Sequence, residues 1–176
     1  MKIATIALTL GLLPLGAQEF QLPVNIDALA EKADEAVSVT MDKSMLTLAS
    51  KFIKHDDDRD LHQILTGLDS IYVRSLEFHN DGEYSIADVD AVRKQLHGPA
   101  WGRLVGVRSK RGENVDVFFK DGGNGKLGGI VVIAAEPREL TIVHIVGTID
   151  PEKIADLGGE FGIPRLERAR VRREAE

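Results

Sequence analysis

The most regular pattern of apolar and polar positions lies at 140–149. Apolar residues occupy both faces of this run, which predicts an interior strand covered on both sides for part of its length. Asp150 then stands where a helix N-cap belongs, and Pro151 stands at the first helical position. We therefore expect a core strand that turns sharply into a docked helix. The apolar positions of that helix are Ile154, Leu157 and Phe161.

Helical periodicity recurs in the N-terminal half of the chain. Ser44 and Ser85 are placed to cap two of the expected helices. Alternating and β-branched runs between the helices predict two strands, the first of them half-buried. The expected helices cover 26–36, 45–52, 61–67 and 86–96, and the expected strands cover 36–41 and 71–78.

From Trp101 onward the pattern changes to four successive strand candidates, at 101–109, 114–120, 127–135 and 140–149. Their connections are short and rich in turn formers, as in an antiparallel meander. The order predicts an α+β domain with an antiparallel sheet of about five or six strands and helices packed mainly on one face. A ferredoxin-like or related two-layer sandwich suits this order. Trp101 is expected to anchor the core, and a ligand-facing role beside Lys110 and Arg111 is the alternative.

The N-terminal segment has the organisation of a secretory signal peptide. One lysine is followed by an apolar run from Ile3 to Leu15 and then by small residues. The run is shorter than the ~20 residues that span a bilayer, which disfavours a retained anchor, and a buried N-terminal strand is the other alternative. We expect a signal peptide over 1–17 with cleavage near Ala17. A periplasmic or otherwise exported protein, with no transmembrane segment in its mature chain, follows from this interpretation.

Charge and cysteine content exclude several classes of protein. The 176-residue chain has a formal net charge of -6, whereas the segment 165–176 is mildly basic. An acidic body argues against nucleic-acid binding, which needs a basic surface. The chain has no cysteine, so disulfides, thiol catalysis and cysteine-ligated metals are excluded. We expect one α+β domain over 18–164 and an Arg-rich tail over 165–176. The tail is interpreted as a solvated, frayed helix end, with a binding arm for an anionic lipid or polymer as the alternative.

Two loops invite a ligand interpretation that their spacing does not support. An EF-hand begun at Asp56 would need glycine at Leu61 and glutamate at Gly67. The run 56–60 is therefore interpreted as an acidic helix start in solvent, with weak calcium binding as the alternative. The run 121–126 lacks the spacing of a phosphate loop, and a strand follows it in place of a helix, so a flexible hairpin turn is favoured.

The ionisable residues form no recognisable catalytic pattern. No pair of histidines shows the spacing of a zinc helix, and His144 is interpreted as a strand histidine satisfied by local hydrogen bonds. Glu77, Glu136 and Glu139 are interpreted as exposed strand-edge charges, with a carboxylate pair as the alternative. We assign no catalytic, cofactor-binding or metal-ligating residue and expect no cofactor. The histidines are His55, His62, His79, His97 and His144.

A combination of motifs resembles one bacterial family. The chain reads IYVRSLEF at 71–78, then GEYS and a helix, and then WGRLVGVRSKRGENVDV at 101–117. AAEPRELTIVHIVGTID and LGGEFGIP follow at 134–150 and 157–164. This combination resembles the family catalogued as domain of unknown function 4252, over about 46–164. The resemblance implies a small exported envelope protein of a Gram-negative bacterium, with no established activity and no site residues.

Two classes of function fit these patterns. The first is an exported, non-catalytic envelope protein that binds a protein or polymer through exposed sheet edges or the Arg-rich tail. The alternative is a small-ligand-binding protein or hydrolase with a pocket between sheet and helices. The lack of a catalytic pattern favours the first class, so we lean against an enzyme. An envelope protein is the expected partner, nucleic acid is not, and the sequence leaves the oligomeric state open.

Overall fold

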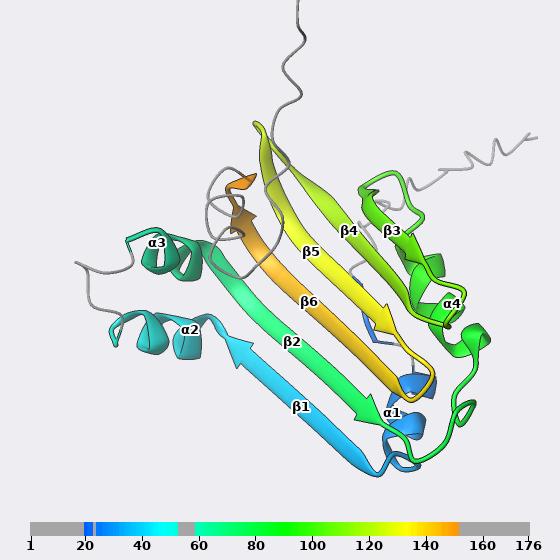
Figure 1. Ribbon diagram of the computed structural model, residues 1–176. Helices are drawn as coiled ribbons and strands as arrows, with labels where there is room; N and C mark the ends of the chain where they lie inside the picture. The colour runs from blue at the N-terminus through cyan, green and yellow to red at the C-terminus, as the bar shows by residue number, and fades with distance from the viewer. Residues whose placement is uncertain (1–19, 23, 53–58, 152–176) are drawn as a thin grey trace, which may run out of the picture.

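The computed structural model describes residues 20–22, 24–52 and 59–151 (Figure 1). Within these residues one antiparallel sheet and four helices form an α+β fold. The strands are β1 (Glu35–Asp42), β2 (Leu68–Glu77), β3 (Trp101–Arg108), β4 (Asn114–Gly123), β5 (Lys126–Ala135) and β6 (Glu139–Ile149). The helices are α1 (Val24–Ala30), α2 (Lys43–Ser50), α3 (Arg59–Gly67) and α4 (Ile86–Gln95).

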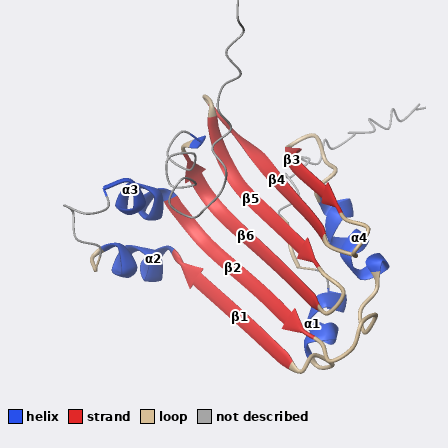
Figure 2. Ribbon diagram, in the orientation of Figure 1, coloured by secondary structure: helices blue, strands red, loops and turns tan. Residues whose placement is uncertain are grey.

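The six strands lie in the order β1-β2-β6-β5-β4-β3, and every neighbouring pair is antiparallel (Figure 2). Strands β3 to β6 are connected in sequence as the predicted meander, and β6 then pairs with β2. The prediction that β6 is an interior strand is confirmed, because it lies between β2 and β5. The expectation of five or six strands is also confirmed.

Helices α1 and α4 cover one face of the sheet, which we call the covered face. In Figure 1 the sheet is seen from its opposite side, with α1 and α4 behind it. Leu140 and Ile142 of β6 lie on the covered face and are only 1% and 2% exposed. The core here consists of Phe20, Ile26, Leu29, Leu76, Phe78, Val89, Val92, Leu96, Phe118, Val131, Ile133, Ala135, Leu140 and Ile142.

Helices α2 and α3 lie at the end of the sheet where β6 finishes, and a second, smaller core forms there. Leu46 of α2 is fully buried against Leu68 and Ile149. Gly147 permits this closure, because its φ is 143° and an added Cβ would lie 2.5 Å from the Leu68 Cα. Side chains packed against this core are Met41, Ile64, Leu65, Ile71, Leu127, Ile130 and Ile145.

The helices therefore divide between two cores, and the expectation of helices mainly on one face is not confirmed. A ferredoxin-like arrangement is not confirmed either. Among the helices of the described segments, none has the length and apolar content that crossing a lipid bilayer requires.

Helix boundaries differ from expectation where polar side chains compete for the cap. Ser85 caps α4 as predicted, in a capping box with Asp88. The prediction that Ser44 caps the second helix is wrong, because the Asp42 carboxylate accepts the Met45 N–H and the Ser44 hydroxyl. The helix expected over 26–36 ends at Ala30, since β1 already begins at Glu35. The first strand was expected to be half-buried, but as an edge strand it is mostly exposed.

Several expectations concern residues outside the described ranges and stay predictions. They are the signal peptide over 1–17, the helix after Asp150, the acidic residues 56–58 and the Arg-rich tail over 165–176.

Candidate functional site

A row of six valines, one from each strand, crosses the face of the sheet opposite to the covered face. Register brings these side chains side by side, because each residue is the direct Cα partner of the next. At about 4.8 Å between strands the row is about 24 Å long. In sheet order the row consists of Val39, Val73, Val143, Val132, Val117 and Val105.

Among residues 20–22, 24–52 and 59–151, no helix covers this valine row as α1 and α4 cover the opposite face. Val39 and Val105 on the edge strands are 38% and 40% exposed. The four central valines are only half-buried, while Ile142, which precedes Val143 on the same strand, is 2% exposed. Side chains in a sheet shield their lateral neighbours, so half-burial is what strand neighbours alone provide.

A second row lies next to the valine row, on the side away from α2 and α3. Its centre is polar: Ser75 and Thr141 are direct partners, and their hydroxyl oxygens are 2.7 Å apart. Its outer positions are apolar, and Val37 and Val107 are 41% and 47% exposed. We call these two rows together the open face. The second row consists of Val37, Ser75, Thr141, Ala134, Val115 and Val107.

Three glutamates border the open face at its far end. Glu35 is the direct partner of Glu77, and Glu77 is the direct partner of Glu139. The Glu139 carboxylate turns back onto the open face, where it accepts the Thr141 hydroxyl at 3.1 Å. Like charges directly opposite on neighbouring strands are destabilising. Within residues 20–22, 24–52 and 59–151, no ion pair joins any of the three to a cation. We call Glu35, Glu77 and Glu139 the glutamate row.

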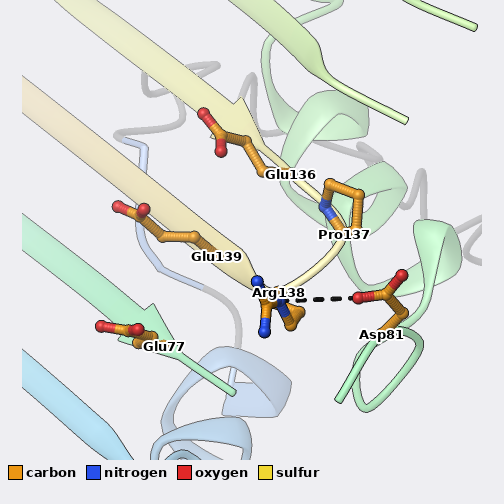
Figure 3. A pocket seen from close by; sticks show the side chains of 6 residues that line it. All are labelled: Glu77, Asp81, Glu136, Pro137, Arg138 and Glu139. Atoms are coloured by element: carbon orange, nitrogen blue, oxygen red, sulfur yellow. Dashed lines mark ion pairs between the residues drawn. The ribbon is translucent and has the colours of Figure 1, made fainter. Parts of the chain in front are cut away.

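The glutamate row continues into a shallow depression of about 380 Å³ at the β5–β6 turn (Figure 3). Glu77, Glu136 and Glu139 extend in the same general direction there, while Arg138 reaches to the other side, 3.6 Å from Asp81. Sequence reasoning named these three glutamates as a possible carboxylate pair, and the structure does bring them together. All three are exposed, so they lack the burial that prepares a carboxylate for acid–base chemistry.

Tyr84 holds the backbone of this acidic turn in place. Its hydroxyl donates to the Glu136 carbonyl and lies 3.1 Å from the Glu139 carbonyl. Burial, with a smaller contribution from the Glu136 carboxylate, raises the pKa of Tyr84 to about 12. The phenol therefore stays protonated and fixes where the two glutamates leave the turn.

On the covered face, the buried carboxylate of Asp116 forms ion pairs with three arginines. Asp116 is fully buried and accepts Arg93 Nε and Arg108 Nη2, both at 2.8 Å. Arg103 Nη1 lies 3.7 Å from the same carboxylate. Arg93 also pairs with Asp90 at 2.9 Å, so this cluster ties α4 to strands β3 and β4. The cluster stabilises the fold and is not a ligand site, because the Asp116 side chain is not exposed to solvent.

His144 lies among aromatic rings on the covered face. Its ring centroid is 4.8 Å from that of Phe20 and 5.9 Å from that of Tyr72, with Trp101 at 6.3 Å. Burial, aided by the charge of Lys120, lowers the pKa of His144 to about 4. His144 is therefore a neutral side chain packed in the core. The expected role of Trp101 as a core anchor is confirmed by its packing against that core.

The remaining candidates from the sequence lie apart from one another. His79 pairs with Asp34 at 3.5 Å, and His97 lies beside Phe118. The run 121–126 comprises the end of β4, the two-residue turn at Asn124 and Gly125, and the first residue of β5, and Asn124 has a φ of 53°. His55 lies outside the described ranges. Among the described residues, no group of three or more ionisable ligands is placed to hold a metal ion.

Sequence reasoning missed the open face as a unit. Each valine was visible as one member of an alternating strand, but the row depends on the register of five strand pairs. Glu77 and Glu139 were named from the sequence, but Glu35 was missed for the same reason, since the β1–β2 register is what places it beside Glu77. An available signal was the β-branched content of the positions between the core residues of β4, β5 and β6.

Comparison with known proteins adds a family but no activity. No match was found among curated proteins or solved structures. The family model described as a domain of unknown function, DUF4252, matches residues 30–157, which include all six strands. The match covers most of the chain and agrees with the motif resemblance. This chain therefore belongs to the domain of unknown function 4252 family.

Proposed function

We propose that this protein is an exported, non-catalytic interaction module of the bacterial envelope. Its open face binds an amphipathic segment of a partner protein, with an apolar stripe followed by cationic residues. The observation that carries the proposal is the valine row, which crosses all six strands and is covered by no helix of the described part of the chain. Contiguous apolar surface bordered by charge is typical of protein-binding sites.

The chemistry of the partner follows from the border of the open face. The apolar rows would bury an aliphatic or aromatic stripe, since neither row carries a charged side chain. The glutamate row would receive lysines or arginines, which would relieve the repulsion between its carboxylates. Export is supported by the signal-peptide pattern of 1–17 and by the family resemblance.

The alternative function, a small-ligand-binding protein or hydrolase, requires a pocket between sheet and helices. The depression at the β5–β6 turn is instead shallow and acidic. A second depression, of about 300 Å³, lies between α3 and the end of β6 and is lined by residues such as Ile64, Thr148 and Asp150. Neither resembles the enclosed, mostly apolar site that small ligands occupy.

Binding should be tested first with the full chain as bait in an envelope fraction, and then with the purified captured protein. The double variant Val132→Thr/Val143→Thr keeps β-branched shape but removes apolar surface from the open face. Ile86→Thr is the matched control, because Ile86 is 55% exposed at the start of α4.

We expect the double variant to bind the captured protein at least about tenfold more weakly, since each lost methyl group forfeits roughly 1 kcal/mol of burial. Ile86→Thr should bind as the unmodified chain does. The charge variant Glu77→Lys/Glu139→Lys should also weaken binding, and more so at low salt. Equal affinity for all variants would show that the partner binds elsewhere.

A further inference from the structure

We propose that two copies of this chain pair along β1, antiparallel and with Val39 on the two-fold axis, so that two six-stranded sheets join into one. The dimer goes beyond the proposed function, because its contacts involve the free edge of β1 rather than the open face. Three features of β1 support it: its side chains, the direction of its backbone groups and the distribution of charge along it.

β1 is an edge strand without the features that prevent pairing. Within the described part of the chain, β2 is the only strand that pairs with it, and Figure 2 shows β1 at the border of the sheet. Its register runs from Glu35 to Asp42 without a shift, and none of the residues between them is charged or proline. Val37 and Val39 are 41% and 38% exposed. A long, flat and apolar edge of this kind readily pairs with another strand.

The backbone of β1 presents hydrogen-bonding groups to its free side. The Phe78 N–H donates to the Arg138 carbonyl at 2.8 Å, and this pair continues the β2–β6 register. Backbone groups alternate in direction along a strand, so odd-numbered residues of β2 bond to β1, and odd-numbered residues of β1 bond to β2. The N–H and C=O groups of Ala36, Ser38 and Thr40 therefore point away from the sheet. A second strand beside β1 would meet donors and acceptors that β2 does not use.

One antiparallel register matches this edge to itself. With Val39 directly opposite Val39 of the second copy, Val37 lies opposite Met41 of the second copy. On the other side of the strand, Ser38 lies opposite Thr40 of the second copy. Apolar side chains thus meet apolar ones, hydroxyls meet hydroxyls, and about six backbone hydrogen bonds form. Such a contact is isologous, which is the type that closes a two-fold dimer.

The charges of two copies are compatible in this register. Glu35 would lie beside Lys43 of the second copy, and Asp42 would lie opposite Ala36 of the second copy. No carboxylate of the strand then stands opposite another, and opposite charges meet at each end of the pairing. The edge is complementary to itself in charge as well as in shape, which favours a second copy over a strand of another protein.

The neighbouring registers fit less well. With the axis one residue earlier, Asp34 of each copy would lie opposite Asp42 of the other, and like charges directly opposite are destabilising. With the axis two residues earlier, Glu35 would lie against Val39 of the second copy. With the axis one residue later, α2 would interrupt the pairing sooner, since it follows β1 directly.

The dimer would also lengthen the open face. Direct partners lie on the same face of an antiparallel sheet, so the valine rows of two copies would meet end to end at Val39. At ~4.8 Å between strands the joined row would be about 53 Å long.

Disulfide trapping tests the register, because the chain has no cysteine of its own. Val39→Cys would face itself across the axis, in a pair whose Cβ atoms are roughly 4.5–5.5 Å apart. Val37→Cys is the matched control, because Val37 has the same face and nearly the same exposure, but its two copies would be about 13 Å apart along the strands. In protein recovered reduced from cells that express the full chain, we expect Val39→Cys to link at least about tenfold faster than Val37→Cys on oxidation.

Equal rates would overturn the inference, since random collisions treat the two positions alike. Faster linking by Val37→Cys would also overturn it, because the axis would then lie at Val37. Light scattering of the unmodified protein should show a mass that doubles as concentration rises, and a monomeric mass at every concentration would sink the dimer.

Hydrogen exchange tests the edge without any substitution, and therefore also if the cysteine variants do not fold. The Ser38 and Thr40 amides should exchange slowly in concentrated protein and faster on dilution, because only the dimer protects them. The Val37 and Val39 amides bond to β2 in both states and serve as the internal control. Ser38 and Thr40 amides whose exchange does not change with concentration would rule out the β1 contact.

Thr40→Pro distinguishes the dimer from the proposed function. The Thr40 N–H points away from β2, so proline keeps the β1–β2 hydrogen bonds but removes bonds of the dimer. The dimer dissociation constant should rise at least about tenfold, while the open face still distinguishes Val132→Thr/Val143→Thr from the unmodified chain. A folded Thr40→Pro protein that dimerises as before would overturn the inference and leave the proposed function intact.

Discussion

Replacing Asp116 by alanine should destabilise the fold more than any change on the open face. The Asp116 side chain is fully buried and accepts hydrogen bonds from Arg93 Nε at 2.8 Å and from Arg108 Nη2 at 2.8 and 3.0 Å. Its removal leaves the Arg93 guanidinium, 11% exposed, without that partner. Breaking a buried ion pair on one side costs about 3–5 kcal/mol.

The surroundings of Arg93 support this loss of stability for Asp116→Ala. Its Nη2 atom is already buried without a hydrogen-bond partner in the described structure, so Arg93 has no spare contact to compensate. Asp90 would still neutralise part of the charge through Nη1 at 2.9 Å, which places the loss at the lower end of that range. At roughly 3 °C per kcal/mol, we expect the melting temperature to fall by about 10 °C.

Urea denaturation monitored by circular dichroism, with calorimetry for the melting temperature, measures this loss. Arg103→Ala is the control, because Arg103 is 56% exposed and 3.7 Å from the carboxylate, and it should cost less than about 1 kcal/mol. The double variant Arg93→Met/Asp116→Leu should be more stable than Asp116→Ala, since no buried charge then lacks a partner. A loss below about 1 kcal/mol for Asp116→Ala, or a double variant no better than the single one, would refute the reasoning.

Three further predictions follow from local geometry. Ser85→Ala should lower the free energy of unfolding by about 1 kcal/mol in urea titrations through loss of the capping box, whereas Ser85→Asp should retain most of it. Gly147→Ala should lower the free energy of unfolding by about 2–3 kcal/mol, because the φ of Gly147 is 143° and the new Cβ would lie 2.5 Å from the Leu68 Cα. In the same assay the control Gly98→Ala should be nearly neutral, because no atom lies within 4 Å of the position of its Cβ. Burial lowers the pKa of His144 to about 4 in the folded chain, so the unfolded chain binds a proton at this histidine more readily. The free energy of unfolding should therefore fall as the pH is lowered from about 6.5 toward 4. His144→Phe should flatten that part of the pH–stability curve, and an unchanged curve would contradict the burial of a neutral histidine.

The sequence was sufficient for the elements whose signals are local. The meander was readable because its strands alternate with short turns, and the cap at Ser85 was readable because Asp88 stands at the capping-box position. The cap at Asp42 was not, because Asp42 belongs to the end of a strand and only the sharp entry into α2 brings its carboxylate to the Met45 N–H. The predicted start of the second helix was therefore wrong, because Asp42 both ends β1 and caps α2.

Contacts that cross elements were not readable from the sequence. Asp116 occupies a position where the pattern of β4 calls for an apolar residue, yet its partners Arg93 and Arg108 come from a helix and a neighbouring strand. Nothing in their spacing along the chain brings them together. The same holds for the glutamate row, which exists only because the β1–β2 and β2–β6 pairs bring three strands into one register.

The two faces of β6 show the limit most clearly. Ile142 and Val143 are both apolar, so the sequence predicted a strand covered on both sides for part of its length. In the described residues, helices α1 and α4 bury Ile142, whereas Val143 has only its strand neighbours. An alternation of apolar residues indicates that a face of the strand is buried. It does not indicate whether a helix of the same domain, a distant segment or a partner buries it.

The sheet edges and the Arg-rich tail were the contact surfaces expected from the sequence, and one of the two edges, β3, is protected against the addition of a further strand. Along β3, the register shifts between Arg103 and Val105, and charged Arg103 and Arg108 lie on the edge. Bulges and charges of this kind are how natural proteins prevent a further strand from adding. The valine row carries no such protection, although six aligned valines are the surface most in need of it. The other edge strand, β1, pairs with β2 without a register shift and has no charged residue between Glu35 and Asp42, so it lacks this protection. Our proposal therefore places the partner on the open face rather than on the β3 edge.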